Sequence, residues 1–131
     1  MVGMFIVQLL KLKGCQTVIA VDPETDRLEK AKACGADFVF VPDDPALLTQ
    51  LHLLTANRGA DITMEVVGTS QTISHCISLL RKGGNLTLVG NLSPKVEMPL
   101  QAIVSRQLRI QGSCAINGEY PEILNLIESG K

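Results

Sequence analysis

The feature that most constrains the fold is a strict alternation of helical segments with short apolar runs. Strands are predicted at 17–22, 37–41, 61–67, 85–89 and 108–113. Helices are predicted at 4–13, 23–34, 45–56, 70–81, 100–105 and 120–129. Such alternation requires crossover connections and places the strands side by side in a parallel sheet. The sequence therefore predicts an α/β fold with a doubly wound, mostly parallel sheet of the Rossmann type, forming one domain over residues 1–131.

Composition agrees with a sheet that is covered on both faces. Apolar residues make up 46% of the chain and aromatic residues 3%, so the core is built from aliphatic side chains. The net charge of −1 gives no attraction for nucleic acid or an anionic membrane, and we expect neither as a partner. The apolar start is interrupted by Gln8 and Lys11 and is too short to span a bilayer. One face of the helix there is marked by Val2, Phe5, Ile6, Leu9 and Leu10.

The cysteines and histidines do not form a pattern that binds metal. They are Cys15, Cys34, Cys76, Cys114, His52 and His75, and no two cysteines have C-x-x-C spacing. Structural zinc sites need closely spaced pairs of such ligands. We therefore expect no metal site in this chain, and we interpret the cysteines as reduced residues of a cytoplasmic protein.

The most informative single residue is Asp22, which ends the apolar strand 17–22 about 20 residues after Gly3. A carboxylate in this position accepts hydrogen bonds from both ribose hydroxyls of a dinucleotide, and it repels the extra phosphate of NADP. The sequence thus predicts NAD as the cofactor. Asp22 could also cap the following helix, because Pro23 comes next. Arg27 could reach the adenosine ribose or the adenine, or lie in solvent as an ordinary surface arginine.

Other strand ends should lie on the same rim as Asp22, since ligands of doubly wound sheets bind beyond the carboxyl ends of the strands. Gly68 and Gly90 end two strands and would leave room for a flat ring, although both could be plain turn glycines. Backbone groups that could bind the nicotinamide ring and its carboxamide belong to Val67, Val89 and Ser113. Glu65 interrupts an apolar strand, and burial there would be costly without hydrogen bonds. We expect a structural role for it.

The segment around Gly3 matches only the end of a glycine-rich phosphate-binding turn. Gly3 would let the first helix pack closely on the sheet and bring its positive end near a pyrophosphate. The strand and the two glycines that usually precede this position are missing, so we expect a fragment of a larger enzyme. The missing strand would lie between 17–22 and 61–67. We expect another segment to fill that place rather than these two strands to close up and pair.

Several motifs together resemble one known family, the medium-chain dehydrogenases of the zinc alcohol dehydrogenase type. The resemblance rests on Val21-Asp22 through Lys32, Gly35-Ala36-Asp37, Gly59-Ala60-Asp61 through Gly68, Arg81-Lys82-Gly83-Gly84 through Gly90, and Gly112-Ser113 with Gly118-Glu119-Tyr120 through Lys131. It implies the coenzyme-binding domain of an oxidoreductase that transfers a hydride between a secondary alcohol or polyol and NAD. It also implies that the zinc and the catalytic residues belong to a catalytic domain absent from this chain, so none of the catalytic residues lies here. In this family the edge strand Leu108 to Ser113 would join a homo-oligomer.

Three other functions remain open at the level of sequence. One is a zinc-free, NADPH-dependent quinone reductase, against which Asp22 argues because such enzymes need a neutral or basic residue there. Another is a methyltransferase, which would carry a final antiparallel strand that the tail does not show. The last is a fragment without catalysis that serves only as an interaction unit.

Overall fold

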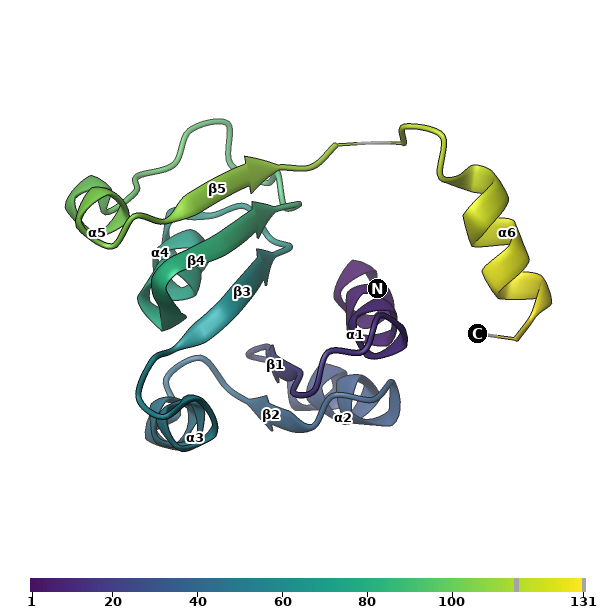
Figure 1. The fold of residues 1–131 in the computed structure, drawn as a ribbon, viewed down its shortest axis with the longest axis horizontal. Coiled ribbons are helices and arrows are strands. Elements are labelled where there is room, and N and C mark those ends of the chain that lie inside the picture. The colour runs from purple at the N-terminus through teal and green to yellow at the C-terminus, as the bar shows by residue number, and fades with distance from the viewer. Residues whose placement is uncertain (115, 131) are drawn as a thin grey trace.

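The computed structural model describes residues 1–114 and 116–130, which form helices and strands in regular alternation (Figure 1). The helices are α1 (Val2–Leu12), α2 (Thr25–Ala33), α3 (Pro45–Thr55), α4 (Ser70–Leu79), α5 (Leu100–Ser105) and α6 (Tyr120–Glu128). The strands are β1 (Ile19–Val21), β2 (Phe38–Phe40), β3 (Ala60–Glu65), β4 (Leu80–Leu88) and β5 (Arg109–Gly112). Every element predicted from the sequence is present, and the α/β class is confirmed.

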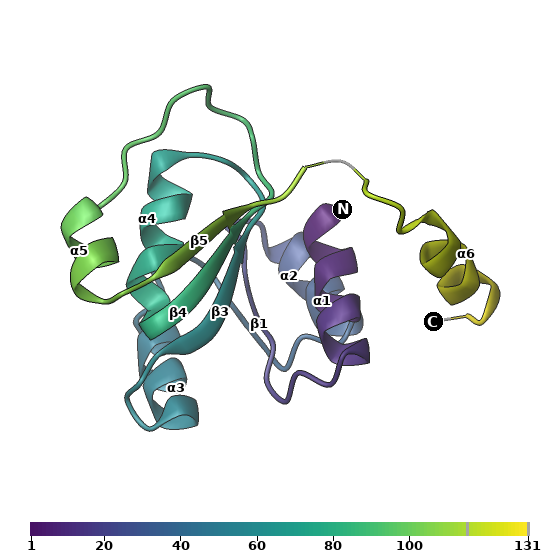
Figure 2. The same cartoon turned by 45° about the horizontal axis from the view of Figure 1, so that its top comes forward.

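The strands form two parallel sheets. One sheet pairs β1 with β2, and the other has the order β3-β4-β5. These orders are the ones expected on either side of a missing central strand in a doubly wound sheet. Within the described residues β1 and β3 do not pair with each other, so the sheet has not closed up. Figures 1 and 2 show β1 and β3 facing one another across the middle of the molecule.

Each sheet has its own hydrophobic core. Beside β1 and β2, the buried residues are Val7, Val18, Ala31 and Ala36, contributed by α1, α2 and the segments that lead into the strands. Beside β3, β4 and β5, they are Ile73, Ile77, Leu80 and Leu86, with α5 also packing there through Ala102 and Ile103. The aliphatic composition thus gives two small cores, one for each sheet.

Local sequence explains where the helices start. Asp44 accepts a hydrogen bond from Ala46 N (2.8 Å) at the start of α3, and Pro45 occupies the first turn. Thr69 caps α4 in a capping box with Thr72. Helix α2 was predicted to begin at residue 23, whereas it begins at Thr25 and its N-cap is Glu24.

The junction between α4 and β4 also differs from its prediction. The strand was predicted to begin at Asn85, whereas β4 begins at Leu80, directly after the helix. The pairing of β3 with β4 shifts its register between Ala60 and Ile62, and Gly83 has φ +71°. Gly83 and Gly84 therefore form an irregularity inside the strand, which glycine tolerates without steric cost.

Helices α1, α3, α5 and α6 leave apolar side chains exposed. On α1, Val7 is buried whereas Val2 (51% exposed), Phe5 and Leu9 from the apolar face are not, because α1 is covered mainly on the side of α2. Helix α6 lies apart from both sheets in Figures 1 and 2. An ion pair between Lys13 Nζ and Glu122 Oε1 (3.3 Å) links it to the end of α1.

No described helix is long and apolar enough to cross a membrane.

Candidate functional site

Asp22 follows β1 directly, and the backbone holds its carboxylate in place. Its Oδ1 accepts a hydrogen bond from Glu24 N (2.9 Å), which closes a short turn before α2. Its own N–H donates to Phe40 O (3.2 Å) and ties it to the end of β2. Within residues 1–114 and 116–130, Oδ2 has no hydrogen-bond partner, and the side chain is about a third exposed. Asp22 therefore shapes the turn and keeps one oxygen for another donor. It is not the N-cap of α2, since that position is held by Glu24, whose side chain makes no capping hydrogen bond.

Arg27 lies one turn into α2 on the same side as Asp22. Its Nη1 is 3.7 Å from Asp22 Oδ1, and its side chain is mostly exposed. A pair this exposed contributes little to stability. The guanidinium is consequently free to move toward a ligand that binds beside Asp22.

At the end of β3, Glu65 is only 2% exposed and accepts hydrogen bonds through both its side chain and its main chain. Oε1 accepts from Val67 N and Gly68 N, both at 2.8 Å, and Oε2 accepts from Gly68 N at 2.9 Å. The main-chain oxygen accepts from Val89 N (2.8 Å) and Gly90 N (3.0 Å). The structural role expected for Glu65 thus has a physical basis, since these N–H groups compensate the burial of its charge.

The loops after β3 and β4 pack backbone against backbone at Gly68 and Gly90. A Cβ atom on Gly90 would lie 2.3 Å from Gly68 N, and one on Gly68 would lie 2.6 Å from Asn91 N. Further hydrogen bonds run from Leu92 N to Val67 O (3.1 Å) and from Ser93 N to Gly68 O (3.0 Å). We call residues 65–68 and 89–93 the rim clamp. Its glycines are required by the contact between the loops, whatever binds next to them.

The remaining site residues lie around the rim clamp. Ser113 follows β5 and donates its N–H to Leu88 O (2.8 Å), so it stands beside the end of β4. At the start of α1, a Cβ on Gly3 would lie 3.8 Å from Val66 Cγ2, which is an ordinary contact. Gly3 is therefore next to the rim, but no described atom makes glycine obligatory there.

The structure thus brings the predicted residues together in two groups. Asp22 and Arg27 lie at the end of β1, and the rim clamp with Ser113 and Gly3 lies at the ends of the other sheet. The sequence did not indicate the contributions of Leu92 and Ser93, because they act through backbone groups that any residue provides.

A zinc site does not fit the described residues. No cluster of three or more histidine, cysteine, aspartate or glutamate side chains occurs in residues 1–114 and 116–130. Burial, with a smaller contribution from the charge of Glu65, raises the pKa of Cys76 to about 12, so its thiol stays protonated at neutral pH. A protonated thiol is a poor metal ligand.

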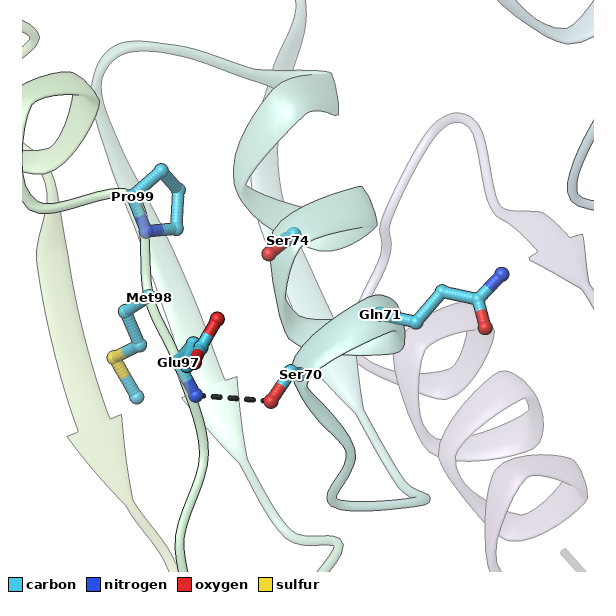
Figure 3. Close-up of a pocket in the computed structure, with 6 residues that line it drawn as sticks. All are labelled: Ser70, Gln71, Ser74, Glu97, Met98 and Pro99. Atoms are coloured by element: carbon cyan, nitrogen blue, oxygen red, sulfur yellow. Dashed lines mark hydrogen bonds between the residues drawn. The ribbon is translucent and has the colours of Figure 1, made fainter.

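A hollow of about 400 Å³ lies away from the predicted site, between the start of α4 and the segment before α5 (Figure 3). Its lining residues are Ser70, Gln71, Ser74, Glu97, Met98 and Pro99. In Figure 3, Glu97 N donates a hydrogen bond to Ser70 Oγ (2.9 Å), which joins the two sides of the hollow. None of the predicted site residues lines it.

Comparison with known proteins assigns the chain to a family. The model of the zinc-binding dehydrogenases matches residues 2–129. The chain belongs to the zinc-binding dehydrogenase family. It is 30% identical over 131 residues to sorbitol dehydrogenase from Bacillus subtilis, covering 98% of this chain and 37% of that protein. It is also 30% identical over 135 residues to D-xylulose reductase A from Aspergillus oryzae, covering 99% of this chain and 38% of the relative.

Solved structures of dehydrogenases share the fold. D-Arabinose dehydrogenase from Sulfolobus solfataricus superimposes with a TM-score of 0.89 at 25% identity, over 97% of this chain and 39% of that one. A zinc-binding dehydrogenase from Sinorhizobium meliloti bound to NADP superimposes with a TM-score of 0.82 at 26% identity, over 98% of this chain and 39% of that one. These matches confirm the family and the Rossmann-type fold predicted from the sequence. The chain spans less than two fifths of the length of these relatives.

Proposed function

We propose that this chain is the NAD-binding domain of an oxidoreductase that transfers a hydride between a secondary alcohol or polyol and NAD. The observation that carries the proposal is Asp22, with one carboxylate oxygen free at the end of β1. The substrate class is proposed from the relatives, which include a sorbitol dehydrogenase, a D-xylulose reductase and an (R,R)-butanediol dehydrogenase. In this proposal no residue of the chain is catalytic, and zinc is held outside it.

The described residues fit a dinucleotide that lies across both groups of the site. Asp22 accepts hydrogen bonds from the adenosine ribose, and Arg27 closes over the same half. Gly3 lies next to the rim, at the positive N-terminal end of α1 where a pyrophosphate would be favoured. The rim clamp and Ser113 receive the nicotinamide half. When bound, the nicotinamide accepts or donates the hydride, and the contribution of this chain is to bind and orient it.

We propose NAD rather than NADP as the natural cofactor. A relative of known structure binds NADP, so the family name alone does not choose between them. Asp22 supports NAD, because a 2′-phosphate would place a second negative charge against its carboxylate, and like charges this close are strongly unfavourable. The same residue argues against the alternative of an NADPH-dependent quinone reductase.

The test is the cofactor preference of the protein in its natural length. Wild type should bind and use NAD better than NADP, and Asp22→Asn should reduce that preference by about tenfold or more. Asp43→Asn is the matched control, since it removes the same charge from an exposed position outside the site. Equal use of NADP by wild type would overturn the assignment of Asp22.

We also propose that the protein is a cytoplasmic homo-oligomer joined through β5. Within the described residues β5 pairs only with β4, which leaves its outer edge free. Unpaired edges of this kind are normally covered or paired.

A further inference from the structure

Glu65 is a buried charge that no basic side chain compensates. Within residues 1–114 and 116–130 no lysine or arginine forms an ion pair with it, although it is 2% exposed. The compensation comes from backbone N–H groups at 2.8–2.9 Å. A carboxylate held in this way is costly to bury unless its hydrogen bonds are complete. The position of the carboxylate and the shape of the surrounding loop therefore depend on each other.

Glu65 connects the two loops of the rim clamp. Its side chain reaches forward to Val67 N and Gly68 N, in the loop after its own strand. Its main-chain oxygen holds Val89 N and Gly90 N, in the loop after β4. One residue thus satisfies backbone donors from both loops, at the end of the sheet where the proposed ligand lies.

We propose that Glu65 is a positioning residue that fixes the rim clamp in the shape that receives the nicotinamide half of the dinucleotide. The inference rests on the proposed function. Without the carboxylate, the N–H groups of Val67 and Gly68 lose their partners, and leaving such buried groups unsatisfied is unfavourable. The loop then has to rearrange, and the backbone carbonyl groups of Val67 and Val89 no longer point where the carboxamide of the nicotinamide needs them. Binding to a site that is already formed avoids this cost of ordering.

The two halves of the dinucleotide should respond differently to the loss of Glu65. The adenosine half is assigned to Asp22, which follows β1, and to Arg27 in α2. Neither residue makes any of the hydrogen bonds of the rim clamp. ADP-ribose contains this half and the pyrophosphate but lacks the nicotinamide. Comparing NADH with ADP-ribose therefore separates the effect on the rim clamp from a general loss of structure.

The experiment measures the affinities of NADH and ADP-ribose by calorimetry for wild type, Glu65→Gln and Asp22→Asn, using the protein in its natural length. Glutamine keeps the size of glutamate but places an NH₂ group against backbone N–H groups. We expect Glu65→Gln to weaken the affinity for NADH by about tenfold or more, whereas the affinity for ADP-ribose should change by less than about twofold. Asp22→Asn should weaken the binding of both ligands.

The outcomes are distinct. Equal weakening of both ligands by Glu65→Gln, or no change in either, overturns the positioning role. Failure of wild type to bind NADH or ADP-ribose overturns the proposed function instead. If Glu65→Gln does not fold, amide hydrogen exchange of ligand-free wild type tests the proposal instead. Slow exchange at Val67, Gly68, Val89 and Gly90 before ligand is added is expected, and fast exchange there contradicts a clamp formed in advance.

Discussion

At the scale of single residues, Asp37 does for the first sheet what Glu65 does for the second. Its Oδ2 accepts a hydrogen bond from Val18 N (2.7 Å), and Lys11 Nζ lies 3.1 Å from both carboxylate oxygens. It thereby joins the end of α1 to the starts of β1 and β2. The hydrogen bond from Val18 N and the nearby Lys11 ammonium hold the pKa of Asp37 below its usual range.

This lowered pKa predicts a dependence of stability on pH. A carboxyl group whose pKa falls on folding stabilises the protein above its unfolded pKa of about 3.9, and the contribution is lost as the pH falls through the folded pKa. Asp37→Asn should lower the free energy of unfolding by about 1 kcal/mol at pH 7, because the side chain is partly exposed. The difference from wild type should shrink below about pH 4.

Urea denaturation of wild type and Asp37→Asn between pH 3 and pH 7 measures this difference. Asp43→Asn is the control, because Asp43 is exposed and has no described hydrogen bond. If both variants differ from wild type by the same amount at every pH, the carboxylate of Asp37 does not contribute through its ionisation.

At the scale of elements, the loops after β3 and β4 depend on the absence of a side chain at Gly90. A Cβ there would lie 2.3 Å from Gly68 N and from Val67 C, both backbone atoms that cannot rotate away. Gly90→Ala should therefore destabilise the protein by about 3 kcal/mol or more, because overpacking forces the backbone to shift. Gly112→Ala should have an effect within about 0.5 kcal/mol, since no heavy atom lies within 4 Å of its added methyl. Thermal unfolding of the two variants makes the comparison, and a similar loss in both would contradict the role of Gly90.

The edge strand β5 gives the second prediction at this scale. Ser113 N donates to Leu88 O, so alternation along the strand turns the N–H of Ile110 away from β4 and toward the free edge. Ile110→Pro removes this outward donor and leaves the pairing with β4 in place. If copies of the protein pair through β5, the variant should form monomers in analytical ultracentrifugation.

The control for Ile110→Pro is Ile110→Ala, which loses the side chain that packs near the core but keeps the N–H. The alanine variant should keep the oligomeric mass of wild type. A folded proline variant with unchanged mass would show that another surface holds the oligomer.

At the scale of the whole molecule, the sequence predicted the order and type of every element, because hydrophobic periodicity and capping residues are local signals. It also indicated that Asp22 and the strand-end glycines lie at the carboxyl ends of their strands. It could not assign the hydrogen bonds of Glu65, since its partners include backbone groups of a distant loop. Nor did it indicate that Gly68 and Gly90 contact each other, because this close approach depends on how the two loops pack.

The two separate sheets lead to the last prediction. At the ends of β1, Val18 O and Asp22 N form hydrogen bonds with the segment of β2. Because alternate residues point to opposite sides of a strand, the backbone groups of Ile19 and Val21 point away from β2, toward β3. In β3, the pairing of Glu65 O with β4 likewise turns away those of Ile62 and Met64. None of these backbone groups has a hydrogen-bond partner in residues 1–114 and 116–130.

We predict that an extended segment from outside residues 1–131 pairs with both strands in the working protein. Within the described residues both strands carry these unpaired groups along an open edge, and open strand edges are normally covered or paired. Hydrogen exchange measures the outcome at Ile19, Val21, Ile62 and Met64. These amides should exchange slowly in the protein of natural length and quickly in the isolated 131-residue chain, whereas Ala20, whose N–H faces β2, should be protected in both. Equal protection in the isolated chain would mean that β1 and β3 close up and pair without any added strand.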